Sequence, residues 1–162
     1  MRMKKQAIYI ETTIVSYLAA RPSRDPFLLG CQRLTRRWWR QERGGYELFS
    51  SQFVRDEADK GELLMARRRL VLLKGIPDLE ASEKVMELTA AILKKAPIPP
   101  KAAEDAAHIA TAAVHEMDYL LTWNCSHIAN ATIMRSVQKV CAVHGLRMPV
   151  ICTPTQLTRH LP

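Results

Sequence analysis

Carboxylate side chains occur at three separate places in this sequence where chemistry could be carried out. Glu11 comes directly after the apolar segment AIYI, Glu57 lies in SSQFVRDEADKG, and Asp105 lies in KAAEDAAHIATAAV. Carboxylates that meet in space repel one another, by roughly 4 kcal/mol for two charges about 4 Å apart at an effective dielectric near 20. A hard divalent cation relieves that repulsion, and oxygen ligands suit Mg²⁺ or Mn²⁺. If the fold brings these residues together, they predict a metal centre that activates water.

A cluster of polar residues follows the apolar segment DYLL. The stretch TWNCSHIAN, residues 122–130, contains Asn124 and His127. An amide can ligate Mg²⁺ through its oxygen or bind a phosphate through its nitrogen. We therefore expect Asn124 and His127 to place a phosphate at the rim of the carboxylate site. His108 follows Asp105 by about one helical turn, so it is expected either next to the metal ligands or as a buried core histidine.

Cysteine and histidine offer two other chemistries. Cys125, His127, Cys141 and His144 could in principle enclose a zinc ion. Cys141, however, is in helical register with apolar residues such as Val137, which favours a buried cysteine. Cys125 with His127 as its base could act as a nucleophile, but nothing nearby supplies an oxyanion hole. Both alternatives are weaker than the carboxylate site.

The elements that must position these residues alternate between strands and helices. Strands are expected over 6–10, 46–51, 118–122 and 150–153, with a short edge strand within 75–82. Helices are expected over 12–20, 25–45, 52–60, 62–75, 83–96, 101–117 and 133–145. Such alternation predicts a parallel sheet covered by helices on both faces. Ligands of these sheets bind beyond the carboxyl ends of the strands, where Glu11, Glu57 and Asn124 should gather.

Two helix starts can be assigned from capping residues. Thr12 or Thr13 is expected to cap the helix that follows the first strand. Asp25 is expected to cap the next helix, with Pro26 at its first position. The apolar stripe of that second helix consists of Leu28, Cys31, Leu34 and Trp38, and the opposite face carries Arg33, Arg36, Arg37, Arg40 and Arg43.

Composition limits the class of protein. The 162 residues suit one domain, residues 1–162, and contain 24 Lys and Arg against 16 Asp and Glu, a formal net charge of +8. Such an excess favours a polyanionic partner, nucleic acid first of all. The four cysteines are scattered without a C-x-x-C pair, so a reducing cytoplasm is expected. No apolar run approaches the length of a membrane span, so no membrane partner is expected.

Three segments, in their order along the chain, resemble a known family. YIETTIVSYL, SSQFVRDEADKG and EDAAHIATAAVHEMDYLLTWN are similar to the PIN-domain ribonucleases, and more narrowly to their VapC-like branch with glutamate at the first acidic position. The resemblance spans nearly the whole chain. It implies an α/β fold of three layers, α/β/α, around a mostly parallel sheet of about five strands. It also implies metal-dependent endonucleolytic cleavage of RNA, commonly by a toxin that is paired with an antitoxin.

The resemblance assigns roles to individual residues. Glu11, Glu57 and Asp105 carry over as ligands of Mg²⁺ or Mn²⁺, and these three with Asn124 form the expected catalytic set. Thr13 would orient the first carboxylate by a hydrogen bond. The residues expected to bind substrate are Thr13, His127, Arg36, Arg37 and Arg40, and His108 is expected next to the metal ligands. The expected partners are RNA, an antitoxin protein and a second copy of the chain.

The chain departs from the family pattern at two positions. The family usually has Asp where this chain has Glu11, and it often has a fourth acid where this chain has Asn124. One anionic ligand fewer weakens a second metal site, so activity could be weak. A catalytically weak PIN-like module that binds RNA is therefore the alternative function. A Rossmann-type nucleotide-binding protein ranks below both, because no Gly-rich phosphate loop follows the first strand.

Overall fold

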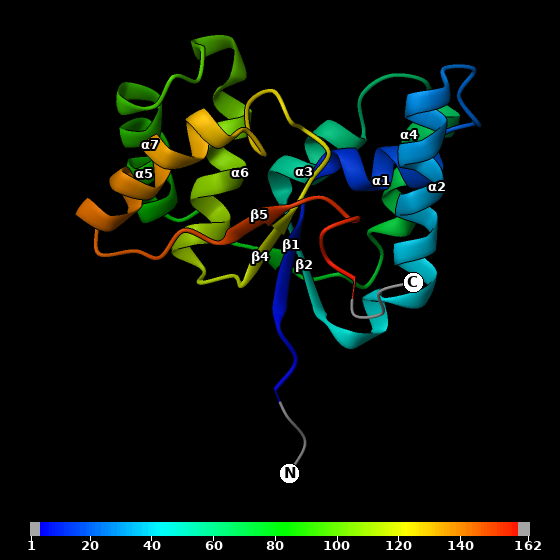
Figure 1. Ribbon diagram of the computed structural model, residues 1–162, viewed down its shortest axis with the longest axis horizontal. Coiled ribbons are helices and arrows are strands. Elements are labelled where there is room, and N and C mark those ends of the chain that lie inside the picture. Colours follow the sequence, from blue (N-terminus) through cyan, green and yellow to red (C-terminus); the bar gives the residue numbers. More distant parts are fainter. Residues whose placement is uncertain (1–3, 159–162) are drawn as a thin grey trace.

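The centre of the fold is a sheet of five parallel strands. We describe residues 4–158 of a computed structural model of the chain. The strands are β1 (Ala7–Ile10), β2 (Glu47–Ser51), β3 (Asp78–Leu79), β4 (Tyr119–Leu121) and β5 (Val150–Cys152), arranged in the order β3-β2-β1-β4-β5 (Figure 1). Every pair of neighbouring strands is parallel. The predicted mostly parallel, five-stranded sheet is confirmed.

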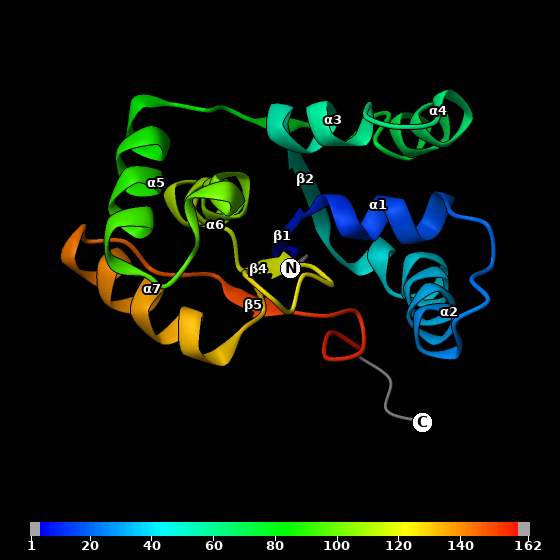
Figure 2. The same ribbon diagram turned by 90° about the horizontal axis from the view of Figure 1, so that it is seen from above.

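Helices cover both faces of this sheet. They are α1 (Thr12–Ala19), α2 (Pro26–Gln41), α3 (Gln52–Ala58), α4 (Leu63–Leu72), α5 (Glu83–Lys95), α6 (Ala103–Val114) and α7 (Ala131–Val143), with short 3₁₀ turns at Arg43–Gly45 and Pro100–Ala102. Helices α5, α6 and α7 lie together on one side, and α1, α2, α3 and α4 lie on the other (Figures 1 and 2). The three-layer α/β/α architecture expected from the sequence is therefore present.

The first strand of the chain occupies the middle of the sheet. Tyr9 in β1 is in register with Phe49 of β2 on one side and with Leu120 of β4 on the other. Ile8, Tyr9 and Ile10 are fully buried, as expected for a central parallel strand that is covered on both faces. Because all the strands are parallel, the residues that follow β1, β2 and β4 come to the same edge of the sheet.

The first helix is capped by a residue that differs from the expected one. Glu11, rather than Thr12 or Thr13, is the N-cap of α1, and its side chain accepts a hydrogen bond from the Thr13 backbone N–H. The prediction of a threonine cap was wrong because the longer Glu side chain folds back onto the helix start. Asp25 caps α2 and Pro26 is its first residue, as predicted.

The buried face of α2 also differs in part from the predicted stripe. Cys31 and Trp38 are buried, but Leu28 is 40 % exposed and Leu34 is only half-buried. The polar residues Gln32 and Thr35 are buried on this face instead. They can be buried because each forms hydrogen bonds that replace its contacts with water, for example from the Thr35 hydroxyl to the Cys31 carbonyl at 2.7 Å.

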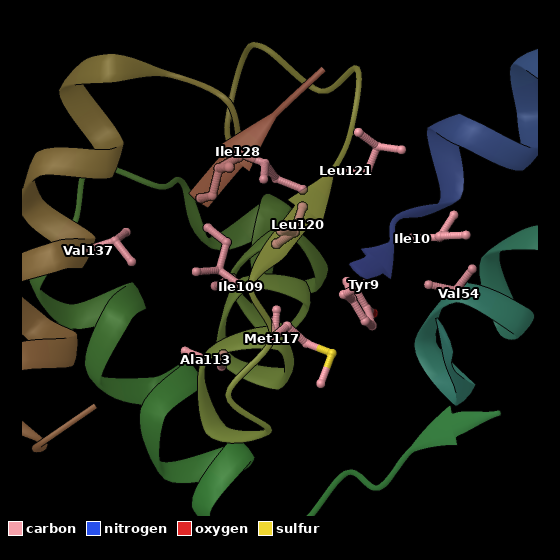
Figure 3. Packing of buried hydrophobic residues seen from close by; sticks show 14 of the residues in the cluster. Tyr9, Ile10, Val54, Ile109, Ala113, Met117, Leu120, Leu121, Ile128 and Val137 are labelled. Carbon is pink, nitrogen blue, oxygen red and sulfur yellow. The ribbon is translucent and has the colours of Figure 1, made fainter. Parts of the chain in front are cut away.

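One cluster of buried hydrophobic residues joins the layers. Its members include Tyr9 and Ile10 of β1, Leu121 of β4, Val54 of α3 and Ile109 of α6 (Figure 3). The cluster therefore lies directly beside the sheet edge that carries the polar residues. Among residues 4–158, no helix is both long enough and apolar enough to cross a membrane.

Candidate active site at the carboxyl edge of the sheet

Glu11 is the first residue after the central strand, and its position is tightly constrained. Its Oε2 atom accepts hydrogen bonds from the Thr13 backbone N–H at 3.1 Å, from the Thr13 hydroxyl, and from the Thr122 hydroxyl at 2.7 Å. The residue is only 4 % exposed. Burial raises the pKa of Glu11, although the charge of His108 and the hydrogen bonds act against that rise. Its second oxygen, Oε1, accepts no hydrogen bond from residues 4–158.

Glu57 approaches Glu11 from α3, the helix that follows β2. Its Oε2 atom accepts a hydrogen bond from the Thr12 hydroxyl and is bonded to His108 Nε2 at 3.0 Å. Burial alone would raise the pKa of Glu57. His108 acts in the opposite direction through its hydrogen bond and its charge, and Thr12 does so through its hydrogen bond. Together they lower the pKa of Glu57 to about 2. The side chain is 19 % exposed, so Glu57 is the member of this group that water reaches most readily.

His108 is the buried partner of Glu57 and comes from α6. It has no exposed surface, and both of its ring nitrogens have partners: Nε2 faces Glu57, and Nδ1 lies 2.7 Å from the Tyr9 hydroxyl. Burial lowers the pKa of His108, but the hydrogen bond with Glu57 and the nearby carboxylate charges raise it overall. A raised pKa favours the imidazolium form of His108, whose positive charge would compensate Glu57.

A buried hydrogen-bond chain continues from His108 into the core. The Tyr9 hydroxyl also lies 2.7 Å from Ser51 Oγ, and that oxygen accepts a hydrogen bond from the Val54 backbone N–H at 3.4 Å. Burial raises the pKa of Tyr9, so its hydroxyl keeps its hydrogen. Sequence reasoning missed Tyr9 and Ser51, because an apolar strand gives no sign that one of its tyrosines donates or accepts a hydrogen bond inside the core.

Asp105, Asn124 and His127 form a second group beside the first. Asp105 Oδ1 accepts a hydrogen bond from Asn124 Nδ2 at 3.0 Å, and Asp105 Oδ2 lies 2.9 Å from His127 Nδ1. Asn124 Oδ1 in turn accepts a hydrogen bond from the His127 backbone N–H at 3.0 Å. Asn124 thus stabilises the loop after β4 through its oxygen and connects that loop to α6 through its nitrogen. His127 Nε2 has no hydrogen-bond partner among residues 4–158.

Thr122 connects the two groups. Its hydroxyl donates to Glu11 and accepts a hydrogen bond from the Asn124 backbone N–H at 2.9 Å. The next residue, Trp123, donates its backbone N–H to the Thr13 hydroxyl at 2.8 Å. The loop after β4 is therefore bonded to the Glu11 carboxylate directly through Thr122 and indirectly through Thr13, so a displacement of the loop would also displace that carboxylate.

One group of residues within 4–158 has the geometry to hold a metal ion. A ligand atom from each of Glu11, Glu57 and His108 lies within 4.8 Å of the other two. The carboxylates Glu11 and Glu57 thus come together at the sheet edge, whereas Asp105 is not a member of this close group. The assignment of Asp105 as a metal ligand, like the catalytic role of Asn124, stays a prediction.

The cysteines do not form the alternative zinc site. Cys125 is exposed and Cys141 is buried, and within the described chain Cys125, His127, Cys141 and His144 form no group close enough to share a metal ion. Cys141 packs in the hydrophobic cluster, as its helical register predicts. His144 Nδ1 lies 2.9 Å from the Val140 carbonyl oxygen.

The arginines expected to bind substrate differ in their exposure and in their hydrogen bonds. Arg36 is half-buried and donates to the Ala20 carbonyl at 2.7 Å, so it holds the end of α1 against α2. Arg37 and Arg40 are exposed and have no hydrogen bond or ion pair within residues 4–158. Trp123 Nε1 donates to Thr35 at 2.7 Å, which places the loop after β4 against the same helix.

The hydroxyl of Tyr9 is expected to contribute to stability as well as to the orientation of His108. Tyr9→Phe removes the partner of two buried polar groups, which should lower the free energy of unfolding by about 1–3 kcal/mol. Tyr119→Phe is the matched control, because within residues 4–158 its hydroxyl has one hydrogen-bond partner, the exposed Gln6. That control should change stability by less than about 0.5 kcal/mol. Urea unfolding of both variants measures the difference, and equal losses would contradict a special role for the Tyr9 hydroxyl.

Asn124→Asp is expected to make stability depend on metal. The new carboxylate would lie where the Asn124 amide now donates to Asp105 at 3.0 Å. Two carboxylates about 4 Å apart repel each other by about 1 kcal/mol in water, and by about 4 kcal/mol at an effective dielectric near 20. Mn²⁺ should therefore raise the Tm of this variant more than that of the wild type. Asn130→Asp is the control, because Asn130 caps α7, where a carboxylate is favourable. A thermal scan with and without Mn²⁺ that gives equal shifts for the two variants would contradict the prediction.

Comparison with known proteins does not place the chain in a family. No protein-family model matches it, and no curated protein matches it. The resemblance to PIN-domain ribonucleases therefore stays a hypothesis based on the three quoted segments.

Proposed function

We propose that the protein is a metal-dependent endoribonuclease that hydrolyses phosphodiester bonds of RNA. The observation that carries this proposal is the convergence of Glu11, Glu57 and His108, with ligand atoms within 4.8 Å of one another, at the edge of a parallel sheet. Two carboxylates held this close in a largely buried position are suited to a divalent cation. The formal charge of +8 suits a polyanionic substrate.

The residues of the site have separable tasks in such a reaction. A divalent cation bound there would supply charge neutralisation to the phosphodiester and activation of water. Glu11 would be held in one orientation by Thr13 and Thr122, which removes the need to order it when substrate binds. His127, whose Nε2 atom is free of partners within the described chain, would in its imidazolium form donate a hydrogen bond from Nε2 to a phosphate oxygen while Nδ1 donates to Asp105.

The finer parts of the proposal rest on the family resemblance. RNA as the substrate, a toxin role, an antitoxin partner, a second copy of the chain and a cytoplasmic location all follow from the resemblance or from composition. Mg²⁺ or Mn²⁺ as the cofactor follows from the expectation of oxygen ligands. The exposed Arg37 and Arg40 on α2 would supply affinity for the phosphate backbone.

A second function is favoured by one observation. Asn124 stands where a fourth acid is expected, and both oxygens of Asp105 are occupied by Asn124 and His127. A site with fewer anionic ligands binds its metal more weakly. The protein would then be an RNA-binding module of the same fold with little catalytic activity.

An RNA cleavage assay separates these two functions. Wild-type protein with Mn²⁺ or Mg²⁺ should cleave single-stranded RNA internally, and EDTA should stop the cleavage. Glu11→Gln and Glu57→Gln should each lower the rate by at least about 100-fold, because each removes a ligand charge while the side-chain shape is kept. Glu87→Gln, a change of the same kind at an exposed position on α5, should leave the rate unchanged. RNA binding without cleavage in any metal would select the binding module, and the absence of both would refute the proposed function.

The arginines of α2 are expected to act on affinity rather than on cleavage chemistry. Replacing Arg37 and Arg40 by Glu should weaken RNA binding and flatten its salt dependence, because each lost phosphate contact lowers the slope by about 0.7 for single strands. The double change of Arg135 and Lys139 to Glu on α7 is matched in charge and serves as the control. Binding is measured in EDTA over a range of salt concentrations. Equal slopes for the two double variants would mean that the α2 face does not contact RNA.

A further inference from the structure

His108 lies in the candidate site in a way that sequence spacing alone does not predict. Its ring has no exposed surface, yet Nε2 is 3.0 Å from a carboxylate oxygen of Glu57. Two adjacent ligands of an octahedral cation, each at about 2.1 Å, are separated by about 3 Å. The spacing between Nε2 and the Glu57 oxygen, which is that of a hydrogen bond, is therefore also compatible with two ligands of one metal ion.

The other side of the ring is fixed by the core. Nδ1 lies 2.7 Å from the Tyr9 hydroxyl, which lies 2.7 Å from Ser51 Oγ. If Nδ1 donates its hydrogen to Tyr9, and Tyr9 donates to Ser51, the lone pair of Nε2 faces the carboxylates. Histidines that bind metals almost always have such a partner on the second nitrogen, which sets the tautomer and the direction of the ring.

Glu11 has one carboxylate oxygen that accepts no hydrogen bond from the described residues. All of its hydrogen bonds from residues 4–158 fall on Oε2, although the residue is 4 % exposed. Oε1 thus has no donor within the described residues and remains available to a cation. The cluster therefore contains a carboxylate oxygen without a donor from the described residues, as well as three ligand atoms close together.

Asp105 is occupied by other contacts. Each of its oxygens has one partner in the group around the loop after β4, Asn124 Nδ2 at 3.0 Å and His127 Nδ1 at 2.9 Å. Each oxygen keeps a second lone pair, but no Asp105 atom belongs to the group of ligand atoms that lie within 4.8 Å of one another. Its hydrogen bonds are those of a residue that positions the loop.

We propose that His108 is the third protein ligand of the metal, through Nε2, together with Glu11 and Glu57, and that Asp105 positions the loop after β4 instead. This inference rests on the proposed metal-dependent function. A bound metal takes the place of the hydrogen that Nε2 now shares with Glu57. One imidazole among the ligands shifts the preference from Mg²⁺ toward transition-metal ions such as Mn²⁺, because nitrogen ligands suit the softer ions.

Pulsed electron paramagnetic resonance of Mn²⁺ bound to the full chain tests the proposal directly. A directly bound imidazole nitrogen gives a hyperfine coupling to Mn²⁺, and labelling histidine with ¹⁵N changes the form of that coupling. Wild-type protein is expected to show the coupling. His108→Gln should lose it and bind Mn²⁺ at least about 10-fold more weakly, whereas His127→Gln, the matched histidine control beside Asp105, should keep it.

Two further variants protect the test against a simple folding defect. Tyr9→Phe keeps His108 but removes the partner of Nδ1, so the nitrogen coupling should persist while Mn²⁺ affinity falls by about 10-fold. Asp105→Asn should keep both the coupling and an affinity within a few-fold of the wild type, measured by isothermal titration calorimetry. The ligand assignment would be overturned if Mn²⁺ bound to the wild type without nitrogen coupling. It would also be overturned if the coupling were lost in His127→Gln and kept in His108→Gln. Either result would leave the proposed function intact. A wild-type chain that binds no Mn²⁺ at all would overturn both.

Discussion

The arrangement of the site depends on one buried carboxylate, that of Glu11. A carboxylate that is 4 % exposed has lost most of its hydration, and the protein must replace that hydration with hydrogen bonds or positive charge. Three donors from Thr13 and Thr122 supply part of it, and the charge of His108 supplies another part. The start of α1, the loop after β4 and the direction of α6 are all constrained by the need to deliver these groups to one point.

The layer architecture could be predicted from the sequence because local patterns determine it. Apolar segments of strand length alternate with helical periods, and Asp25 and Pro26 mark the start of α2 unambiguously. Glu11 and Glu57 could also be placed at one sheet edge, because residues after parallel strands share that edge whatever their neighbours are. These inferences need only the order of elements and no knowledge of which side chains touch.

The contacts of His108 and Asp105 could not be predicted, because they depend on the rotation of α6 about its axis. Both residues lie within one turn of the same helix, so periodicity places them on one face without saying which of them reaches Glu57. The deciding partner is Tyr9, 99 positions away from His108 in the chain, inside a strand that reads as purely apolar. Leu28 was predicted in the buried stripe of α2 but is 40 % exposed. The spacing of apolar residues along a helix does not say how wide its buried face is.

The central position of β1 has a consequence for how the chain acquires its site during synthesis. β1 is made first, but one of its two neighbours, β4, lies more than a hundred residues later, since Tyr9 is in register with Leu120. A growing chain can pair β1 with β2 early. At that stage Glu11 still lacks its hydrogen bond from Thr122, and Glu57 still lacks its partner His108. Contacts between distant parts of a chain form late. A nascent chain on the ribosome therefore carries an incomplete centre until β4 and Thr122 have emerged.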